Sequence, residues 1–266
     1  MYFDRVQVKR EAKAIIRTAR PSPVFVTLIF ILLTSVLEEV VALFLTNPFS
    51  QALSYLQAGY RPMEVYAYVF GGTAILGLFV SVLLMFYNTV MSYGYASYTL
   101  RLSRYEESGV GNLLEGFNLA AKVVALNLLI SLFTVLWSML FLFPGIVAAY
   151  SYSQAVYCLL DDPEIGVLEA IRRSKLMMRG QKFNLFVLQL SFIGWELLVS
   201  AIGWVMMSGL SLLNTSLAYW VSSLVIWLFN LWLMPYMNIT FAGFYNHLIG
   251  WGRRSEEENA NPRVEF

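Results

Sequence analysis

The sequence predicts an all-α, polytopic integral membrane protein with about six transmembrane helices and both termini in the cytoplasm. Hydrophobic residues make up 58% of the 266 residues and charged residues only 13%, against roughly a quarter charged in soluble domains. Apolar runs of about 20 residues, the length that crosses a bilayer, recur from Val24 almost to the C-terminus. Of the 18 Lys and Arg residues, all except Arg61 fall in segments that would face one side of the membrane. Because cytoplasmic loops are enriched in these residues, their distribution also predicts the orientation.

The first segment, residues 1–20, is predicted to form a basic amphipathic helix. Val6 and Ile15 lie among the cations at roughly helical spacing, and Pro21 and Pro23 then turn the chain. Such a helix would lie on the membrane surface, attracted by anionic headgroups. The alternative is a solvated helix whose charges only fix the orientation. The basic residues of this segment are Arg5, Lys9, Arg10, Lys13, Arg17 and Arg20.

A single transmembrane domain is predicted over residues 21–250, followed by a polar tail at 251–266. Glu38 and Glu39 interrupt the first apolar run. A short interfacial helix, Pro48–Ala58, follows that run, because proline suits a first helical position. The six predicted spans are residues 24–45, 65–88, 121–143, 146–160, 183–207 and 217–240.

Turn and cap residues divide the second half of the chain. Pro144-Gly145 predicts a tight turn between the third and fourth spans. Asp162 and Pro163 predict the start of a cytoplasmic amphipathic helix over residues 163–179, which ends before Gly180. Pro235 predicts a kink in the last span.

Glu196, within the fifth span, is the clearest candidate for a functional group inside the membrane, where ionisable side chains are costly and usually functional. It would bind a proton or a cation, or hydrogen-bond a lipid headgroup. The structural alternative is a protonated carboxyl paired with an amide of a neighbouring span. Glu38 and Glu39 are expected near the outer interface or, alternatively, in an outward-facing vestibule. The candidate partners of Glu196 are Asn127, Gln154 and Asn230.

The sequence contains no recognisable catalytic motif. Cys158 is the only cysteine and His247 the only histidine, so no thiolate metal cluster or imidazole-based site is expected. We therefore predict no catalytic, cofactor-binding or metal-binding residue, no nucleic-acid partner and no enzymatic activity.

The cytoplasmic cations predict contacts with anionic lipid. The leading hypothesis is a non-enzymatic membrane module that engages anionic lipids or a partner protein, with a homo-oligomer left open. The alternative is a small-solute or lipid transporter, such as a scramblase, that uses an intramembrane carboxylate. The candidate lipid contacts are Lys9, Arg10, Lys13, Arg17, Arg172, Arg173, Lys175, Arg179 and Lys182.

The second half of the chain resembles a bacterial membrane-protein family, domain-of-unknown-function family 975. The resemblance implies a multi-span protein of the cytoplasmic membrane of a Gram-positive bacterium, and it supplies no activity. The interval from Trp195 to Pro235 is longer than in the family pattern, and the pattern leaves the position of Glu196 open. The residues that carry the likeness, over about three fifths of the chain, include Trp137-Ser138, Pro144-Gly145-Ile146, Ala149–Tyr152, Asp161-x-Pro163, Glu169-Ala170-Ile171, Ser174, Met177-Met178-x-Gly180-Gln181-Lys182, Leu190–Trp195, Pro235-Tyr236 and Phe244-Tyr245, with the basic opening at Lys9–Ala14.

Overall fold

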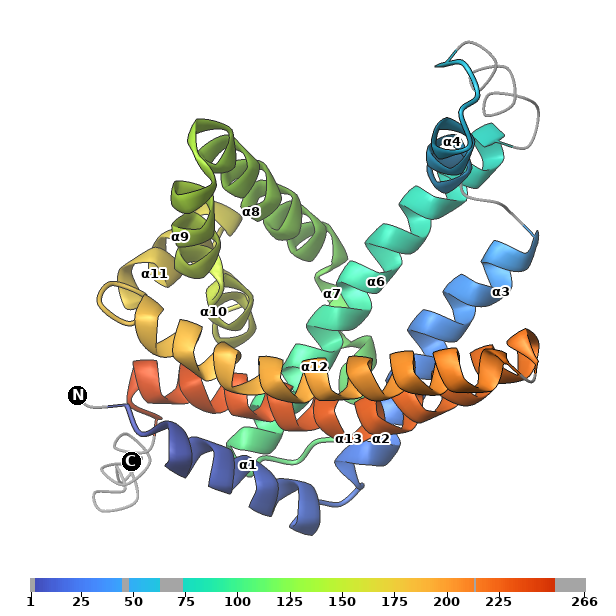
Figure 1. Ribbon diagram of the computed structural model, residues 1–266. Helices are drawn as coiled ribbons and strands as arrows, with labels where there is room; N and C mark the ends of the chain where they lie inside the picture. The colour runs from blue at the N-terminus through green and yellow to red at the C-terminus, as the bar shows by residue number, and fades with distance from the viewer. Residues whose placement is uncertain (1–2, 45–47, 63–73, 213, 252–266) are drawn as a thin grey trace, which may run out of the picture.

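The computed structural model describes residues 3–44, 48–62, 74–212 and 214–251. All regular secondary structure in these ranges is helical (Figure 1). The all-α prediction is confirmed for this part of the chain. In Figure 1, α12 and α13 run alongside each other, whereas α6 and α8 extend away from this pair in different directions.

The basic N-terminal segment forms a helix, α1 (Arg5–Thr18), as predicted. The carboxylate of Asp4 caps it by accepting two backbone N–H groups of the first turn, at 2.8 and 3.2 Å. Ala12 and Ile15 are buried on the side of the helix that packs against α13 (Thr215–Ile249). The apolar face of α1 therefore meets protein, and a location at the membrane surface remains a prediction.

The first apolar run forms three consecutive helical segments, α2 (Pro23–Ile31), η1 (Leu32–Val36) and α3 (Leu37–Phe44). The middle segment is a π-helix. The short helix predicted after it is α4 (Pro48–Gln57), and the chain leaves it at Gly59 with φ +88°. Glycine adopts this left-handed conformation without a steric penalty.

A long helix, α6 (Ala74–Ser103), is followed by a short 3₁₀ helix, η2 (Val110–Leu114), and by α7 (Glu115–Asn118). These two short elements lie directly against α6. A Cβ atom at Gly94 would stand only 2.0 Å from the carbonyl oxygen of Leu113. Glycine at this position therefore lets the two backbones touch.

The hairpin between α8 (Ala120–Leu140) and α9 (Leu142–Tyr152) corrects one prediction. The chain reverses at Phe141, which has extended backbone angles, so Pro144-Gly145 does not form the turn. Proline is tolerated there because it lies in the first turn of α9. A Cβ at Gly145 would lie 1.9 Å from the Oγ of Ser138, so this glycine allows the two helices to approach closely.

The fourth predicted span, residues 146–160, is divided between α9 and α10 (Ala155–Asp161). The hydroxyl of Ser174 bridges the interruption. It donates to the carbonyl oxygen of Ser151 at 2.8 Å and accepts the backbone N–H of Gln154 at 3.1 Å. This bridge pairs two backbone groups that a continuous helix would have paired internally. Because the segment is divided into α9 and α10, the fourth span is not confirmed as one membrane-crossing helix.

The amphipathic helix after this point is α11 (Val167–Met177), which begins four residues later than predicted. The carboxylate of Asp162 does not cap a helix. It binds Arg173 at 3.0 Å instead. The carbonyl oxygen of Pro163 accepts a hydrogen bond from Lys122 at 2.7 Å, and these two contacts hold the segment before α11 as a turn.

The last two long helices, α12 (Lys182–Ser211) and α13, lie side by side (Figure 1). Asn214 caps α13 by accepting the N–H of the third residue that follows it, at 3.0 Å. The helix continues through Pro235 and ends at Gly250, which adopts φ +66°. α6 and α1 also pack against α13.

Five helices among the described residues are long and apolar enough to cross a membrane. Most of their apolar surface is not covered by the protein itself, as expected of helices that face lipid. The second predicted span, 65–88, lies partly outside the described residues, and its described part belongs to α6. The candidate spans are Pro23–Val41, Leu76–Ser103, Ala120–Leu140, Lys182–Leu210 and Leu217–Ile249.

Candidate functional site

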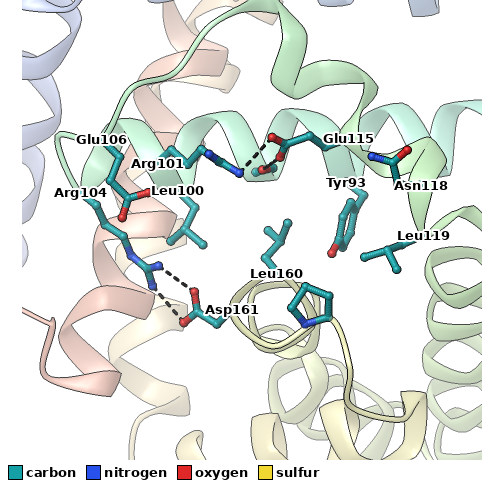
Figure 2. A pocket seen from close by; sticks show the side chains of 12 residues that line it. Tyr93, Leu100, Arg101, Arg104, Glu106, Glu115, Asn118, Leu119, Leu160 and Asp161 are labelled. Atoms are coloured by element: carbon teal, nitrogen blue, oxygen red, sulfur yellow. Dashed lines mark hydrogen bonds and ion pairs between the residues drawn. The ribbon is translucent and has the colours of Figure 1, made fainter. Parts of the chain in front are cut away.

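A pocket of about 500 Å³ lies at the C-terminal end of α6, between that helix, the connection to α7 and the end of α10 (Figure 2). Its lining includes Tyr93 and Ser97 on α6, Glu106 in the connection, and Asn118 on α7. The described residues contain no group of three or more His, Cys, Asp or Glu side chains placed to hold a metal ion. The polar residues at the pocket contact one another through ion pairs and hydrogen bonds.

Arg104 is the centre of the polar contacts at this pocket. Its guanidinium group binds both carboxylate oxygens of Asp161, at 2.7 and 3.0 Å. It also donates to the amide oxygen of Asn246 at 2.9 Å, and it stands 4.1 Å from the ring centre of Trp251. The hydroxyl of Tyr245 donates to Asp161 at 2.7 Å. The Arg104 side chain is only 9% exposed and that of Asp161 27%, so this network ties α6, α10 and α13 together.

A second ion pair lies on the other side of the pocket. Arg101 binds Glu115 at 3.0 Å, and Glu115 also accepts hydrogen bonds from Ser97 and from the side chain of Asn112. The Arg101 side chain is 44% exposed, so water screens this pair more than the pair at Arg104. Both arginines of the pocket are thus bound to carboxylates of the same protein.

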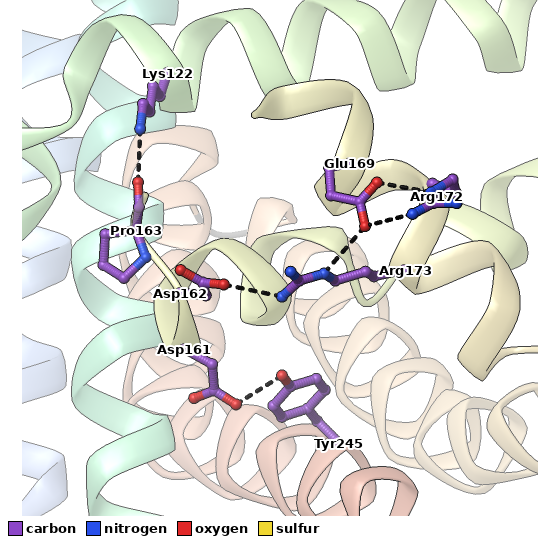
Figure 3. Close-up of polar contacts among 8 residues, drawn as sticks. All are labelled: Lys122, Asp161, Asp162, Pro163, Glu169, Arg172, Arg173 and Tyr245. Atoms are coloured by element: carbon purple, nitrogen blue, oxygen red, sulfur yellow. Dashed lines mark hydrogen bonds and ion pairs between the residues drawn. The ribbon is translucent and has the colours of Figure 1, made fainter. Parts of the chain in front are cut away.

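The basic residues in the middle of α11 are also paired (Figure 3). Arg172 binds both carboxylate oxygens of Glu169, at 2.6 and 2.9 Å. Arg173 contacts Asp162 and, at 3.3 Å, Glu169. Hydrogen bonds from Arg172, then from Arg173, hold the pKa of the Glu169 carboxyl below its ordinary value. Glu169 therefore stays ionised at neutral pH and neutralises part of the charge of α11.

The predicted lipid contacts further along this region have fewer partners. Lys175 and Arg179 are exposed, and Lys182 begins α12. None of these three cations lies within 4 Å of a carboxylate in the described ranges. The segment from Lys175 to Lys182 thus keeps positive charge that is not offset by carboxylates within 4 Å in the described ranges, unlike the middle of α11.

The cations of α1 differ from those of the pocket. None of the six basic residues between Arg5 and Arg20 has a carboxylate within 4 Å in the part of the chain that the structure describes. Lys9 and Lys13 instead place their ammonium groups over the rings of Phe192 and Tyr236. The segment therefore presents an uncompensated positive surface.

The predicted membrane carboxylates do not gather into one site. Glu196 is exposed on α12 and does not line the pocket. The described residues give it none of the predicted amide partners. Glu38 and Glu39 are also exposed, and Glu38 accepts a hydrogen bond from the amide of Asn88 on α6. The pairing expected for Glu196 is thus not observed, because its side chain points away from the packed helices.

Sequence reasoning missed the network around Arg104. The sequence predicts no contact between Arg104, Asp161, Tyr245 and Asn246. Asp161 and Tyr245 both belong to the pattern that carries the family resemblance. Their place in the family pattern was the signal in the sequence that could have drawn attention to Asp161 and Tyr245.

The fold and the site define a class: a helical protein with several helices apolar enough to cross a membrane, whose polar contacts gather at the ends of those helices. Residues 143–250 match the model of the family described as Protein of unknown function (DUF975). The predicted resemblance is confirmed over these residues, about two fifths of the chain. The matched segment includes Asp161, Ser174 and Tyr245 and extends from α9 to the end of α13. Searches of curated proteins and of solved structures find no match.

Proposed function

We propose that this protein is a non-enzymatic membrane module that recruits anionic lipid to the cytoplasmic ends of its helices, chiefly through α1. A partner protein with an acidic surface would use the same cations. The observation that carries the proposal is the absence of carboxylate partners for the cations of α1 among the described residues.

The packing of α1 supports the proposal. Ala12 and Ile15 hold one side of the helix against α13, while Arg10 and Arg17 lie on the exposed side. A fixed helix loses little conformational freedom when an anion binds, which favours binding. Near an anionic surface each Lys or Arg is worth about 1 kcal/mol.

The second basic helix, α11, contributes less in this proposal. Arg172 and Arg173 are already bound to carboxylates, so a lipid phosphate would have to compete with Glu169 and Asp162. Lys175 and Arg179 remain the more available cations of this region. We therefore rank α1 above α11 as a lipid-binding element.

The rival function, transport through a pathway that contains Glu196, has less support. A polar cavity that reaches this carboxyl would favour it, and the pocket at Arg104 does not include Glu196. We therefore retain the module as the proposal.

Lipid selectivity tests the proposed function. Purified protein in mild detergent is mixed with equal amounts of phosphatidylglycerol and phosphatidylcholine, and bound lipids are counted by native mass spectrometry. We expect a preference for phosphatidylglycerol that weakens between 0.1 M and 1 M salt, because the screening length falls from about 10 Å to about 3 Å. Replacing Arg10, Arg17 and Arg20 with Gln should reduce the preference.

The matched control is the double substitution Arg172→Gln and Arg173→Gln on α11. It removes cations that already have carboxylate partners, so the preference should change less. Equal retention of both lipids by the unaltered protein would refute the proposed function.

A further inference from the structure

Two lysines of α1 converge on one pair of aromatic rings. The ammonium group of Lys9 lies 4.1 Å from the ring centre of Phe192 on α12, and that of Lys13 lies 5.5 Å from the ring centre of Tyr236 on α13. The two rings are in edge-to-face contact, with centroids 5.2 Å apart. Phe192 is 1% exposed and Tyr236 is 3% exposed. The aromatic pair is therefore a fixed platform that holds two cations one helical turn apart.

This pair of cations has no compensating carboxylate within 4 Å in the described ranges. The only oxygen that the structure gives to Lys9 is the backbone carbonyl of Ser191, at 3.5 Å. Burial lowers the pKa of Lys9, and the positive charges of Lys13 and Arg5 lower it further. An anion between the two ammonium groups would relieve this repulsion.

The position of the aromatic pair along α12 and α13 agrees with the inner edge of a bilayer. Phe192 and Tyr236 each lie 22 residues from Asn214, where the two helices are joined. At 1.5 Å per residue this is about 33 Å along each helix, and a tilt of about 20° reduces it to about 31 Å. The hydrocarbon core of a bilayer is about 30 Å thick. With Asn214 at the outer edge, both lysines therefore reach the inner headgroup level.

The exposed apolar side chains of α13 support the placement of Lys9 and Lys13 at the inner headgroup level. They extend from Leu217 to Trp232, and none of the large apolar residues between Trp232 and Trp251 is exposed. On α12 the exposed apolar side chains continue past Phe192 to Phe183, so the change in exposure that marks this level is carried by α13 alone.

We propose that Lys9 and Lys13 form a binding site for the phosphate of an anionic phospholipid at the inner headgroup level. The proposal rests on the proposed function and narrows it to one site. The phosphate oxygens accept hydrogen bonds from both ammonium groups, while the acyl chains follow the exposed apolar surface of α12 toward the outer edge. The other cations of α1 act only through general attraction.

Placing Phe192 at the inner headgroup level also changes the expected depth of Glu196 in the membrane. This residue follows Phe192 by four positions, or about 6 Å along the helix. Its exposed carboxyl is thus placed one turn inside the headgroup boundary, where it can reach water, and not at the centre of the membrane. The side chain needs no buried partner at that depth.

The site is tested by titrating purified protein in detergent with phosphatidylglycerol and measuring the apparent affinity by native mass spectrometry. Lys9→Gln with Lys13→Gln should reduce the affinity by about tenfold or more. The matched control, Arg10→Gln with Arg17→Gln, removes two cations from the outward side of the same helix and should reduce it clearly less, because their general attraction is screened by salt. Lys9→Arg with Lys13→Arg keeps both charges and should retain most of the affinity, which separates lost binding from lost folding.

The outcomes separate the site from the wider function. An equal reduction in the two Gln variants would overturn the lysine site and leave the proposed function standing. No preference for phosphatidylglycerol over phosphatidylcholine in any variant would overturn both. Glycerol phosphate, added as a soluble competitor, should displace little lipid, because it lacks the acyl chains. Full displacement at equal concentration would overturn the assignment to a lipid.

Discussion

Two basic regions of this protein look alike in sequence and differ in structure. The arginines at the end of α6 and in the middle of α11 are bound to Asp161, Glu115, Asp162 and Glu169. The cations of α1 contact aromatic rings or solvent, and the described residues give them no carboxylate. Both regions add to the charge count that predicts orientation, with six cations in the α1 segment and four arginines in the paired region. The positive charge of α1 is not offset by carboxylates within 4 Å in the described ranges, whereas the four arginines of the paired region are held in ion pairs.

Arg104→Ala is expected to have the largest effect, because it would remove a guanidinium group that is only 9% exposed and that binds both Asp161 and Asn246. The loss should cost more than the roughly 1 kcal/mol of an exposed pair and less than the roughly 3–5 kcal/mol of a fully buried one. We expect a clear fall in the midpoint of thermal unfolding, measured in detergent by intrinsic fluorescence.

The control for Arg104 is Arg101→Ala, on the same helix. Arg101 is much more exposed, so its loss should cost about 1 kcal/mol or less. Equal destabilisation by both substitutions would show that burial does not distinguish the two ion pairs.

Ser174→Ala is expected to have the next largest effect, also within the paired region. The substitution leaves the buried N–H of Gln154 without its acceptor at the interruption between α9 and α10. An unsatisfied buried group costs about 1–3 kcal/mol. The thermal midpoint should fall, whereas Ser81→Ala, which removes a hydroxyl bonded within α6, should change it little. A normal midpoint for Ser174→Ala would mean that water replaces the hydroxyl.

Local sequence signals predicted most of the helical elements. Apolar runs and the basic amphipathic pattern indicated α1, α8, α12 and α13, because helix formation depends on periodicity and propensity within a short stretch. The interruption of the fourth span was missed, since it depends on the hydroxyl of Ser174, which lies 20 residues from Gln154 in sequence. The turn at Phe141 was also missed. Proline and glycine were taken as a turn signal there, and the close contact of Gly145 with Ser138 was not visible from the sequence.

The site was less predictable than the fold. The role of the candidate cations as lipid contacts stays a prediction, and their pairing depends on which carboxylates tertiary packing brings near. Asp161 and Tyr245 lie 84 positions apart, so no spacing rule joins them. The expected partners of Glu196 were wrong for a related reason, because the direction in which a side chain leaves a helix depends on how that helix packs.

Glu169→Gln would leave α11, like α1, with cations that lack a carboxylate partner on the same helix. We expect its effect to be smaller than the effects of Arg104→Ala and Ser174→Ala. Without the carboxylate, Arg172 and Arg173 are freed, and the affinity for phosphatidylglycerol should rise by about two- to threefold at pH 7. Glu164→Gln is the control, because Glu164 is exposed and has no ion pair among the described residues. An unchanged affinity would mean that paired arginines bind lipid as readily as free ones.

Acidification tests the same pairing without a substitution. Because hydrogen bonds from Arg172 hold the pKa of Glu169 below its ordinary value of 4.5, its stabilising interaction is fully present above that value. The interaction is lost only as the pH falls through the lower folded-state pKa. In the unaltered protein the gain in lipid affinity should therefore appear only at a pH below the ordinary pKa of a glutamic acid, and Glu169→Gln should lack that step. A step at the same pH in both proteins would assign it to another carboxyl.

Glu196→Gln is expected to have the smallest effect and to test whether α1 truly lacks a carboxylate partner. Glu196 stands one turn from Phe192, which holds Lys9, yet no ion pair joins Glu196 to Lys9 within 4 Å. Because the carboxyl is exposed, its neutralisation should change stability by less than about 0.5 kcal/mol. The affinity for phosphatidylglycerol should change less than about twofold. A rise of several-fold would mean that Glu196 neutralises Lys9 in solution, and the contrast between the two basic regions would then be smaller than the structure indicates. Dithionite quenching in proteoliposomes completes the test, because a scrambling signal that Glu196→Gln abolishes would favour transport over the lipid-binding module.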